Sequence, residues 1–151
     1  VNEGGMITTD PGGKAIRQTT FYPFQDAARY GRGISLKGAA RLPKAATCHH
    51  GEQETVTTAC VYNEEQKEIT VFAMNCEMQE DVKLRLSFEG FGSMEGIAWR
   101  ELYDDDPYAK NTFDEEFRVV PKEKELVDVS DGVTEVILKK HSWNVLRWKL
   151  K

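Results

Sequence analysis

The chain has 151 residues, of which 40% are hydrophobic and 30% charged, and its formal net charge is −5. This length and balance predict one folded domain of ordinary size rather than a disordered chain. The negative charge argues against a nucleic-acid or anionic-membrane partner, since both require a basic patch, and no apolar run approaches the roughly 20 residues of a membrane-spanning helix.

The first thirty residues indicate a strand, a turn and a helix. Residues 6–9 are a short β-prone run, and residues 10–13 (Asp-Pro-Gly-Gly) are a strong turn signal. Pro23 suits the first turn of a helix over residues 23–30, because its fixed φ fits there and its missing N–H costs nothing. Gly31 then suits a left-handed helix cap.

The predicted helix has an apolar face formed by Phe24, Ala27 and Ala28. A single strand and helix in front of a β-rich region leave that strand without neighbours for its backbone hydrogen bonds. We therefore expect residues 1–31 to be the end of a larger domain that was cut away. Residues 32–151 are expected to form a separate sandwich.

From residue 34 onward the hydrophobic period changes from about 3.6 residues to about 2. Apolar and polar residues alternate strictly along residues 82–88, so one face of that strand is expected to be buried. Many short strands with frequent turns and no intervening helices predict an antiparallel sandwich or barrel. The expected strands cover residues 55–62, 68–75, 82–88, 97–103, 118–120, 126–129, 133–138 and 143–150.

Three cysteines, Cys48, Cys60 and Cys76, cannot all pair within one chain. An odd number in a domain of this size is more natural in a reducing compartment. Residues 1–10 also lack the basic and apolar regions of a secretion signal. We therefore expect a cytoplasmic location, unless a signal lies upstream.

Two groups of side chains have the residue types of a metal site. Cys48-His49-His50 with Cys60 offers zinc-ligand types, but the spacing matches no established pattern, so we interpret these as ordinary loop and strand residues. Asp104-Asp105-Asp106 offers carboxylates for calcium, but it lacks the spacing and distal Glu of an EF-hand, so we interpret it as a solvated charge run. We assign no metal-binding or cofactor-binding residue.

Three carboxylate pairs raise the question of glycosidase chemistry, which uses two carboxylates across the scissile bond. They are Glu64-Glu65, Glu115-Glu116 and Asp128 with Asp131. Catalytic carboxylates need apolar or charge-coupled surroundings that separate their pKa values, whereas these pairs lie in hydrated turns. We assign no catalytic residue.

Three tryptophans, Trp99, Trp143 and Trp148, lie in predicted strands. A sugar-stacking platform on a sandwich face requires exposed, coplanar rings, and a purely structural domain requires that all three are buried. Tryptophans in alternating strands are more often core residues, which favours core positions over a stacking platform.

Several segments resemble α-L-arabinofuranosidases of glycoside hydrolase family 51, in the same order along the chain. Arg17-Gln18-Thr19-Thr20-Phe21-Tyr22-Pro23-Phe24, followed by Tyr30-Gly31-Arg32-Gly33, is similar to the family's junction between catalytic barrel and C-terminal sandwich. The motifs that match the sandwich itself are Val71-Phe72-Ala73-Met74-Asn75, Asn111-Thr112, Val119-Val120-Pro121 and Ser142-Trp143-Asn144-Val145-Leu146-Arg147.

The resemblance implies a longer parent enzyme with an N-terminal (β/α)8 barrel and a C-terminal jelly-roll-like sandwich. It implies a retaining mechanism with two Glu residues about 5 Å apart on barrel strands that precede Val1, so neither maps onto this chain. It also implies that residues 6–9 end the eighth barrel strand and that residues 13–30 supply the last helix. Residues 9–13 would then lie on the catalytic face as a loop contributor.

Two positions depart from the family pattern. Glu3-Gly4-Gly5 stands where the family usually has an apolar stretch after the pair matched by Val1-Asn2. Ile16 stands where an aromatic residue is expected before Arg17. Both lie in the barrel segment, so the expected sandwich is unaffected.

We therefore predict a mainly β chain: an antiparallel, jelly-roll-like β-sandwich preceded by a short strand–helix remnant of a (β/α)8 barrel. Its predicted function is that of a non-catalytic accessory domain in an enzyme that removes terminal α-L-arabinofuranosyl residues from hemicellulose or oligosaccharides. The expected partners are the catalytic barrel of the same polypeptide, arabinose-containing saccharides through that barrel, and further copies in a homo-oligomer. A stand-alone carbohydrate-binding module and a ligand-free structural domain are the alternatives.

Overall fold

The computed structural model describes residues 5–151. Val1-Asn2 and the departure at Glu3-Gly4 lie outside the described residues. Within the described part, no helix is long and apolar enough to cross a membrane.

The first elements of the described part are a hairpin of β1 (Ile7–Thr9) and β2 (Ala15–Arg17). Asp10 closes its turn, because the Asp10 amide donates to the Lys14 oxygen at 3.0 Å and the Lys14 amide donates to Asp10 Oδ1 at 2.8 Å. The strand and the turn were predicted correctly. The expectation of an unpaired strand was wrong, since β2 satisfies its backbone groups from within the same segment.

Helix α1 (Phe21–Tyr30) starts two residues earlier than predicted, so Pro23 is its third residue. Gly31 has φ −85° and does not form the expected left-handed cap; its amide donates to the Ala27 oxygen at 2.9 Å. A Cβ at Gly31 would lie 2.5 Å from that oxygen, so close backbone approach explains the glycine.

The buried face of α1 is also not the predicted one. Tyr22 and Asp26 are its buried residues, whereas Phe24 is 62% exposed and Ala27 and Ala28 are exposed. The Asp26 carboxylate is thus buried on the side of the helix opposite to the predicted apolar face.

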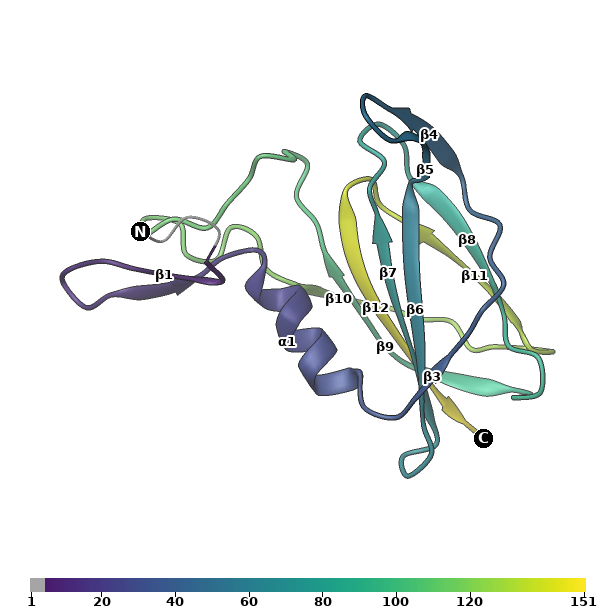
Figure 1. The fold of residues 1–151 in the computed structure, drawn as a ribbon. Coiled ribbons are helices and arrows are strands. Elements are labelled where there is room, and N and C mark those ends of the chain that lie inside the picture. The colour runs from purple at the N-terminus through teal and green to yellow at the C-terminus, as the bar shows by residue number, and fades with distance from the viewer. Residues whose placement is uncertain (1–4) are drawn as a thin grey trace.

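Six antiparallel strands form the main sheet, in the order β10-β9-β12-β7-β6-β3 (Figure 1). Its ends are short edge strands, and the β10 sequence Lys-Glu-Lys is typical of an edge protected by charge. The strands are β3 (Ile34–Leu36), β6 (Val56–Asn63), β7 (Glu68–Asn75), β9 (Met94–Leu102), β10 (Lys122–Lys124) and β12 (Ser142–Leu150).

A second, two-stranded sheet of β8 (Val82–Ser87) and β11 (Val133–Leu138) faces the main sheet (Figure 1). The core between the two sheets confirms the predicted antiparallel β-sandwich, and the alternation along residues 82–88 has the expected inward side. The core includes Ile69, Val71, Leu84, Phe88, Met94, Trp99, Leu126, Val136, Leu138, Leu146 and Trp148.

The opposite face of the main sheet packs against α1 and the loop that follows β9 (Figure 1). Tyr22, Leu102 and Val119 form a second apolar cluster there, with the half-buried Trp143 against it. Consecutive residues of β7 are buried from Ile69 to Ala73 for this reason: each face of the strand is covered.

Two predicted strands are wrong. Residues 118–120 and 126–129 are irregular, although Val119, Leu126 and Val129 are buried. Val129 makes only an isolated bridge to Met94. Burial in loops produces the same apolar pattern as burial in strands, so the pattern alone misplaced these elements. A hairpin of β4 (Lys44–Thr47) and β5 (Gly51–Glu54) was not predicted, because its residues are mostly exposed.

Candidate functional site: the junction between the N-terminal segment and the sandwich

A cleft of about 390 Å³ opens where the ends of β7 and β9 and the start of β12 meet Thr19, just before α1. Its wall includes Thr19 from the N-terminal segment, Met74 at the end of β7 and Trp143 at the start of β12. Around it, three sets of polar contacts join the N-terminal segment to the sandwich. We take this junction as the candidate site.

The first set is centred on Asp26, which is fully buried on the inner side of α1. Its carboxylate forms an ion pair with Arg100 of β9 and accepts a hydrogen bond from Trp143 Nε1 of β12 at 3.2 Å. Burial raises the pKa of Asp26 above its ordinary value, while Arg100 and Trp143 act in the opposite direction. Arg100 is also held by Glu123 of β10, with Nε and Oε1 3.2 Å apart.

The second set is centred on Asn111, which is 2% exposed. Its Nδ2 donates to the Arg17 oxygen at 2.9 Å and to the Val119 oxygen at 3.1 Å, and its Oδ1 accepts from the Val119 amide at 2.8 Å. Gln18 Nε2 completes the set by donating to the Asn111 oxygen at 3.1 Å and to Thr8 Oγ1 at 3.0 Å. The loop after β9 is thereby fastened to the β1–β2 hairpin.

The third set lies at the hairpin turn and at the far end of the helix. Lys14 Nζ lies 2.7 Å from Glu116 Oε1 and donates to the Phe113 oxygen at 2.8 Å. At the other end, the Arg147 guanidinium lies 4.3 Å from the centre of the Tyr30 ring and forms an ion pair with Glu68.

Tyr103 and His141 also line the cleft, with ring centres 5.4 Å apart. Tyr103 donates to Asp105 Oδ1 at 2.5 Å, and this bond raises the pKa of Tyr103 to about 12. The His141 ring nitrogen Nε2 lies 2.8 Å from the Asp104 oxygen. These contacts hold the start of the loop against the β11–β12 turn.

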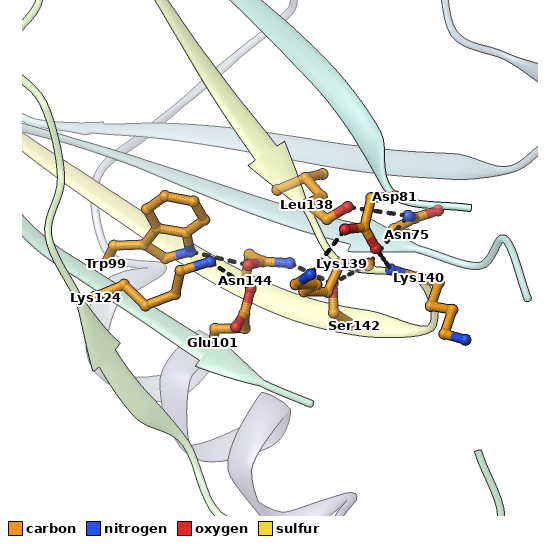
Figure 2. A network of polar contacts seen from close by, with 10 residues as sticks. All are labelled: Asn75, Asp81, Trp99, Glu101, Lys124, Leu138, Lys139, Lys140, Ser142 and Asn144. Atoms are coloured by element: carbon orange, nitrogen blue, oxygen red, sulfur yellow. Dashed lines mark hydrogen bonds and ion pairs between the residues drawn. The ribbon is translucent and has the colours of Figure 1, made fainter. Parts of the chain in front are cut away.

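A polar network runs through the end of the sandwich beside the cleft (Figure 2). Trp99 Nε1 donates to Asn144 Oδ1 at 2.9 Å, and Asn144 Nδ2 donates to Ser142 Oγ at 2.8 Å. Asn75, at the end of β7, donates to the Lys139 oxygen at 3.0 Å. Asn75, Ser142 and Asn144 belong to the motifs that carry the family resemblance, and each is buried in a structural role.

The zinc-type residues are distributed over two elements. Cys48, His49 and His50 occupy the exposed turn between β4 and β5, whereas Cys60 is half-buried in β6 opposite Leu36. Among residues 5–151, no group of three or more His, Cys, Asp or Glu side chains is arranged to hold a metal ion. Cys48, Cys60 and Cys76 are free thiols.

The aspartate run organises its own turn. Asp104 Oδ1 accepts from the Asp106 amide at 3.0 Å, and Asp106 Oδ1 accepts from the Tyr108 amide at 2.9 Å. Arg118 lies 3.6 Å from Asp104 and 3.3 Å from Asp106. The run therefore forms a turn that is held by its own carboxylates and by Arg118.

The carboxylate pairs considered for catalysis lie in turns and loops. Glu64 and Glu65 are exposed between β6 and β7. Asp128 accepts from the Gly96 amide at 2.9 Å and pairs with Lys151 at 2.8 Å. Asp131 has φ 53° in the turn before β11. Glu116 pairs with Lys14 at 2.7 Å, so two of these carboxylates, Asp128 and Glu116, are held by lysines.

The tryptophans do not form a common exposed platform. Trp99 and Trp148 are core residues, 8% and 0% exposed, and the Trp148 indole donates to the Val127 oxygen at 3.0 Å. Trp143 is half-buried on the other face and stacks on Phe72 with ring centres 5.8 Å apart. Core positions were therefore predicted correctly for Trp99 and Trp148, and Trp143 belongs to the junction.

Sequence reasoning did not identify Asp26 or Arg100, and it matched Asn111 without giving it a role. A charged residue in a short helix or strand is usually exposed, so its burial here has no local signal. The resemblance at Gln18 and Asn111-Thr112 was the available indication, because both segments meet in the structure.

Residues 1–142 match the family model described as the α-L-arabinofuranosidase C-terminal domain. An "intracellular exo-α-(1→5)-L-arabinofuranosidase" of Acetivibrio thermocellus is 34% identical over 142 residues, which cover 94% of this chain and 28% of that protein. A protein of the same name from Streptomyces lividans is 36% identical over 147 residues, covering 97% of this chain and 22% of its own length. The chain thus spans about a quarter of these relatives.

Solved structures show the same fold. A family 51 α-L-arabinofuranosidase from Bifidobacterium longum superimposes with a TM-score of 0.86 at 26% identity, over 95% of this chain and 28% of that one. A family 51 arabinofuranosidase from Xanthomonas axonopodis pv. citri gives 0.83 at 19% identity, with the same coverage. The second likeness supports the fold alone.

Proposed function

This chain belongs to the α-L-arabinofuranosidase C-terminal domain family, and we propose that it is the accessory sandwich of an enzyme that removes terminal α-L-arabinofuranosyl residues from arabinose-containing hemicellulose or oligosaccharides. In this proposal residues 1–31 end the catalytic barrel and residues 32–151 form the accessory domain. The catalytic carboxylates belong to the larger remaining part of the polypeptide. The intracellular names of the Acetivibrio and Streptomyces relatives support a cytoplasmic location.

The observation that carries this proposal is the way the N-terminal segment is fastened to the sandwich. Asp26 is bound by Arg100 and Trp143, and Asn111 binds Arg17. Buried polar contacts of this kind leave little freedom between the hairpin–helix segment and the sheet. A segment held this rigidly can transmit the position of an attached domain, which is the structural role proposed for the sandwich.

The role is proposed to be structural because the polar side chains of the junction bind the protein itself. The Asp26 carboxylate, the Asn111 amide and the Tyr103 hydroxyl each contact other groups of the chain. General acid–base catalysis requires a group within hydrogen-bond reach of a substrate proton. We also propose that the full polypeptide is a homo-oligomer, as the family resemblance implies.

The test compares this chain with its full-length polypeptide in the hydrolysis of a chromogenic nitrophenyl α-L-arabinofuranoside. Activity in the full-length polypeptide alone is the expected result. Activity that stays with the purified chain would contradict the accessory role, and inactivity of both would contradict the proposed substrate. Calorimetric titration of the chain with arabinan serves as a second measurement, since binding there would favour a carbohydrate-binding module.

A further inference from the structure

The cleft beside Thr19 has the size and lining of a small-molecule site. Its volume of about 390 Å³ lies in the usual range of such sites, which are concave, mostly apolar and equipped with a few polar groups. Met74 and Met78 are 40% and 45% exposed, so these flexible side chains are open to a ligand. The apolar lining includes Met74, Met78, Leu102, Pro107, Val119 and Trp143.

One polar atom in the wall of this cleft has no partner. The ring of His141 lines the cleft, and its Nε2 lies 2.8 Å from the main-chain oxygen of Asp104. A carbonyl oxygen can only accept, so Nε2 carries the proton of the neutral ring and Nδ1 presents a bare lone pair. Nδ1 is buried and has no hydrogen-bond partner among the described residues. Buried polar atoms nearly always have partners, so we expect a donor from outside the chain at this position.

The imidazole of His141 is held in place by a backbone conformation that is uncommon for histidine. Its φ is 37°, in the left-handed region that glycine and asparagine adopt more easily. The His141 amide donates to the Glu77 oxygen at 2.8 Å, and the ring packs on Tyr103. The turn therefore keeps an imidazole at the cleft wall at a cost in backbone strain, which is typical of binding sites.

The charged groups that line the cleft favour a cation. Asp104 and Asp106 line it, and none of its described lining residues is a lysine or an arginine. Arg118 lies 3.6 Å from Asp104 and 3.3 Å from Asp106, so it offsets one of these two negative charges. The lining as a whole remains negative.

The electrostatic field at Tyr103, in the wall of the same cleft, has the same sign. The hydrogen bond to Asp105 is the main cause of the raised pKa of Tyr103, and the charges of Asp81 and Glu101 act in the same direction. A field that disfavours the phenolate favours a positive charge at the same place. Tyr103 and Trp143 add aromatic rings, whose faces attract organic cations.

We propose that the cleft is a binding site for a small organic cation, a primary ammonium group joined to a short apolar chain. The ammonium group donates a hydrogen bond to His141 Nδ1 in the field of the Asp104 and Asp106 carboxylates. The apolar chain lies against Met78 and Trp143. A sugar fits less well, because the lining is mostly apolar and carries a negative charge. This site goes beyond the proposed function and does not depend on the hydrolysis of an arabinofuranoside.

Binding of n-pentylammonium tests the proposal, with pentan-1-ol as an uncharged probe of the same length. Saturation-transfer NMR at pH 8 measures both dissociation constants, in the full-length polypeptide and in the 151-residue chain. The cation should bind about tenfold more tightly than the alcohol in both, because only the cation forms the charged contacts. Equal affinities for the two probes, no binding of either, or binding in the isolated chain alone would overturn the proposal. Tighter binding of L-arabinose than of the cation would also overturn it.

Replacement of His141 tests the contribution of Nδ1. His141→Gly suits the left-handed turn and removes the acceptor, so the affinity for n-pentylammonium should fall about tenfold. The affinity for pentan-1-ol should change less than about twofold, which shows that the cleft is still formed. His49→Gly, in the exposed β4–β5 turn, is the matched control and should leave both affinities unchanged. A cation affinity that His141→Gly does not lower would contradict the proposal.

Two substitutions at Met78 give a test that does not alter the turn at His141. Met78 is 45% exposed, so either replacement should leave the fold intact. Met78→Lys supplies a tethered ammonium group and should weaken binding of n-pentylammonium about tenfold, by competing for the same negative charges. Met78→Gln, of similar length but uncharged, should weaken it less than about threefold. Equal affinities of the two variants for the cation would refute a charge-selective site.

Discussion

The side-chain amide of Asn111 donates a hydrogen bond to the main-chain oxygen of Arg17 at 2.9 Å, which joins segments 94 residues apart. The same side chain also bonds the amide and the oxygen of Val119. We expect Asn111→Ala to lower the free energy of unfolding by about 3 kcal/mol, because buried partners would lose their hydrogen bonds. Urea unfolding measures this free energy. The control is Lys110→Ala, which changes an exposed residue of the same loop; an equal loss of free energy in both variants would refute the role given to Asn111.

The contact between Trp99 and Asn144 predicts a measurable coupling energy. Both residues are buried, and the indole donates to the amide oxygen at 2.9 Å. Trp99→Phe and Asn144→Ala should each destabilise the fold, and a double-mutant cycle should give a coupling of about 1–2 kcal/mol. Additive effects would mean that the hydrogen bond contributes nothing beyond packing.

Gly96 in β9 lies against the main chain of the loop before β11. A Cβ at this position would lie 2.3 Å from the Leu126 oxygen, and nothing lies within 4 Å of a Cβ built at Gly38. Gly96→Ala should therefore destabilise the fold by about 1–3 kcal/mol, the usual cost of overpacking. Gly38→Ala is the matched control and should change the thermal midpoint little; similar shifts for both would show that the loop moves aside freely.

The hydrogen bond from Tyr103 to Asp105 predicts an unusual alkaline titration. It raises the pKa of Tyr103 from 10.0 to about 12, chiefly because the neutral phenol is the donor. The stabilising contribution is thus fully present below pH 10 and is lost as the pH rises through 12. Ultraviolet titration of the phenolate should show that Tyr103 ionises late, and Asp105→Asn should move the pKa of Tyr103 toward 10.0. A titration curve unchanged by that substitution would contradict the assignment.

The cysteines should differ in reactivity. Burial raises the pKa of Cys60 to about 11, whereas Cys48 is exposed in the β4–β5 turn. Because the thiolate is the reactive form, iodoacetamide at pH 8 should modify Cys48 much faster than Cys60. Mass spectrometry of peptides from the folded chain measures both rates, and the difference should vanish in urea.

Sandwich strands could be predicted from the sequence where only pairing in a sheet explains the alternating or β-branched side chains. Residues 68–75 and 133–138 alternate or are β-branched because they pair in sheets, and both strands were found within these bounds. The same logic failed at Val119 and Leu126, since burial in a loop also selects apolar residues.

The junction was less accessible to prediction, and α1 shows why. Its apolar residues Phe24, Ala27 and Ala28 indicated a buried face, but Tyr22 and Asp26 are the buried residues. A carboxylate can be buried only if it has a partner such as Arg100, which lies far away in the sequence. The local periodicity of the helix does not indicate that partner.

Local physics therefore sufficed for the β class, strands such as β7 and β11 and the turn at Asp10, because each depends on neighbours a few residues apart. Motif resemblance added the family. Only the tertiary structure decided the contacts of Asp26 and Asn111, since each contact joins groups more than 70 residues apart in the chain. Buried polar groups must find partners in three dimensions, and the partner that each one found is a property of the folded chain.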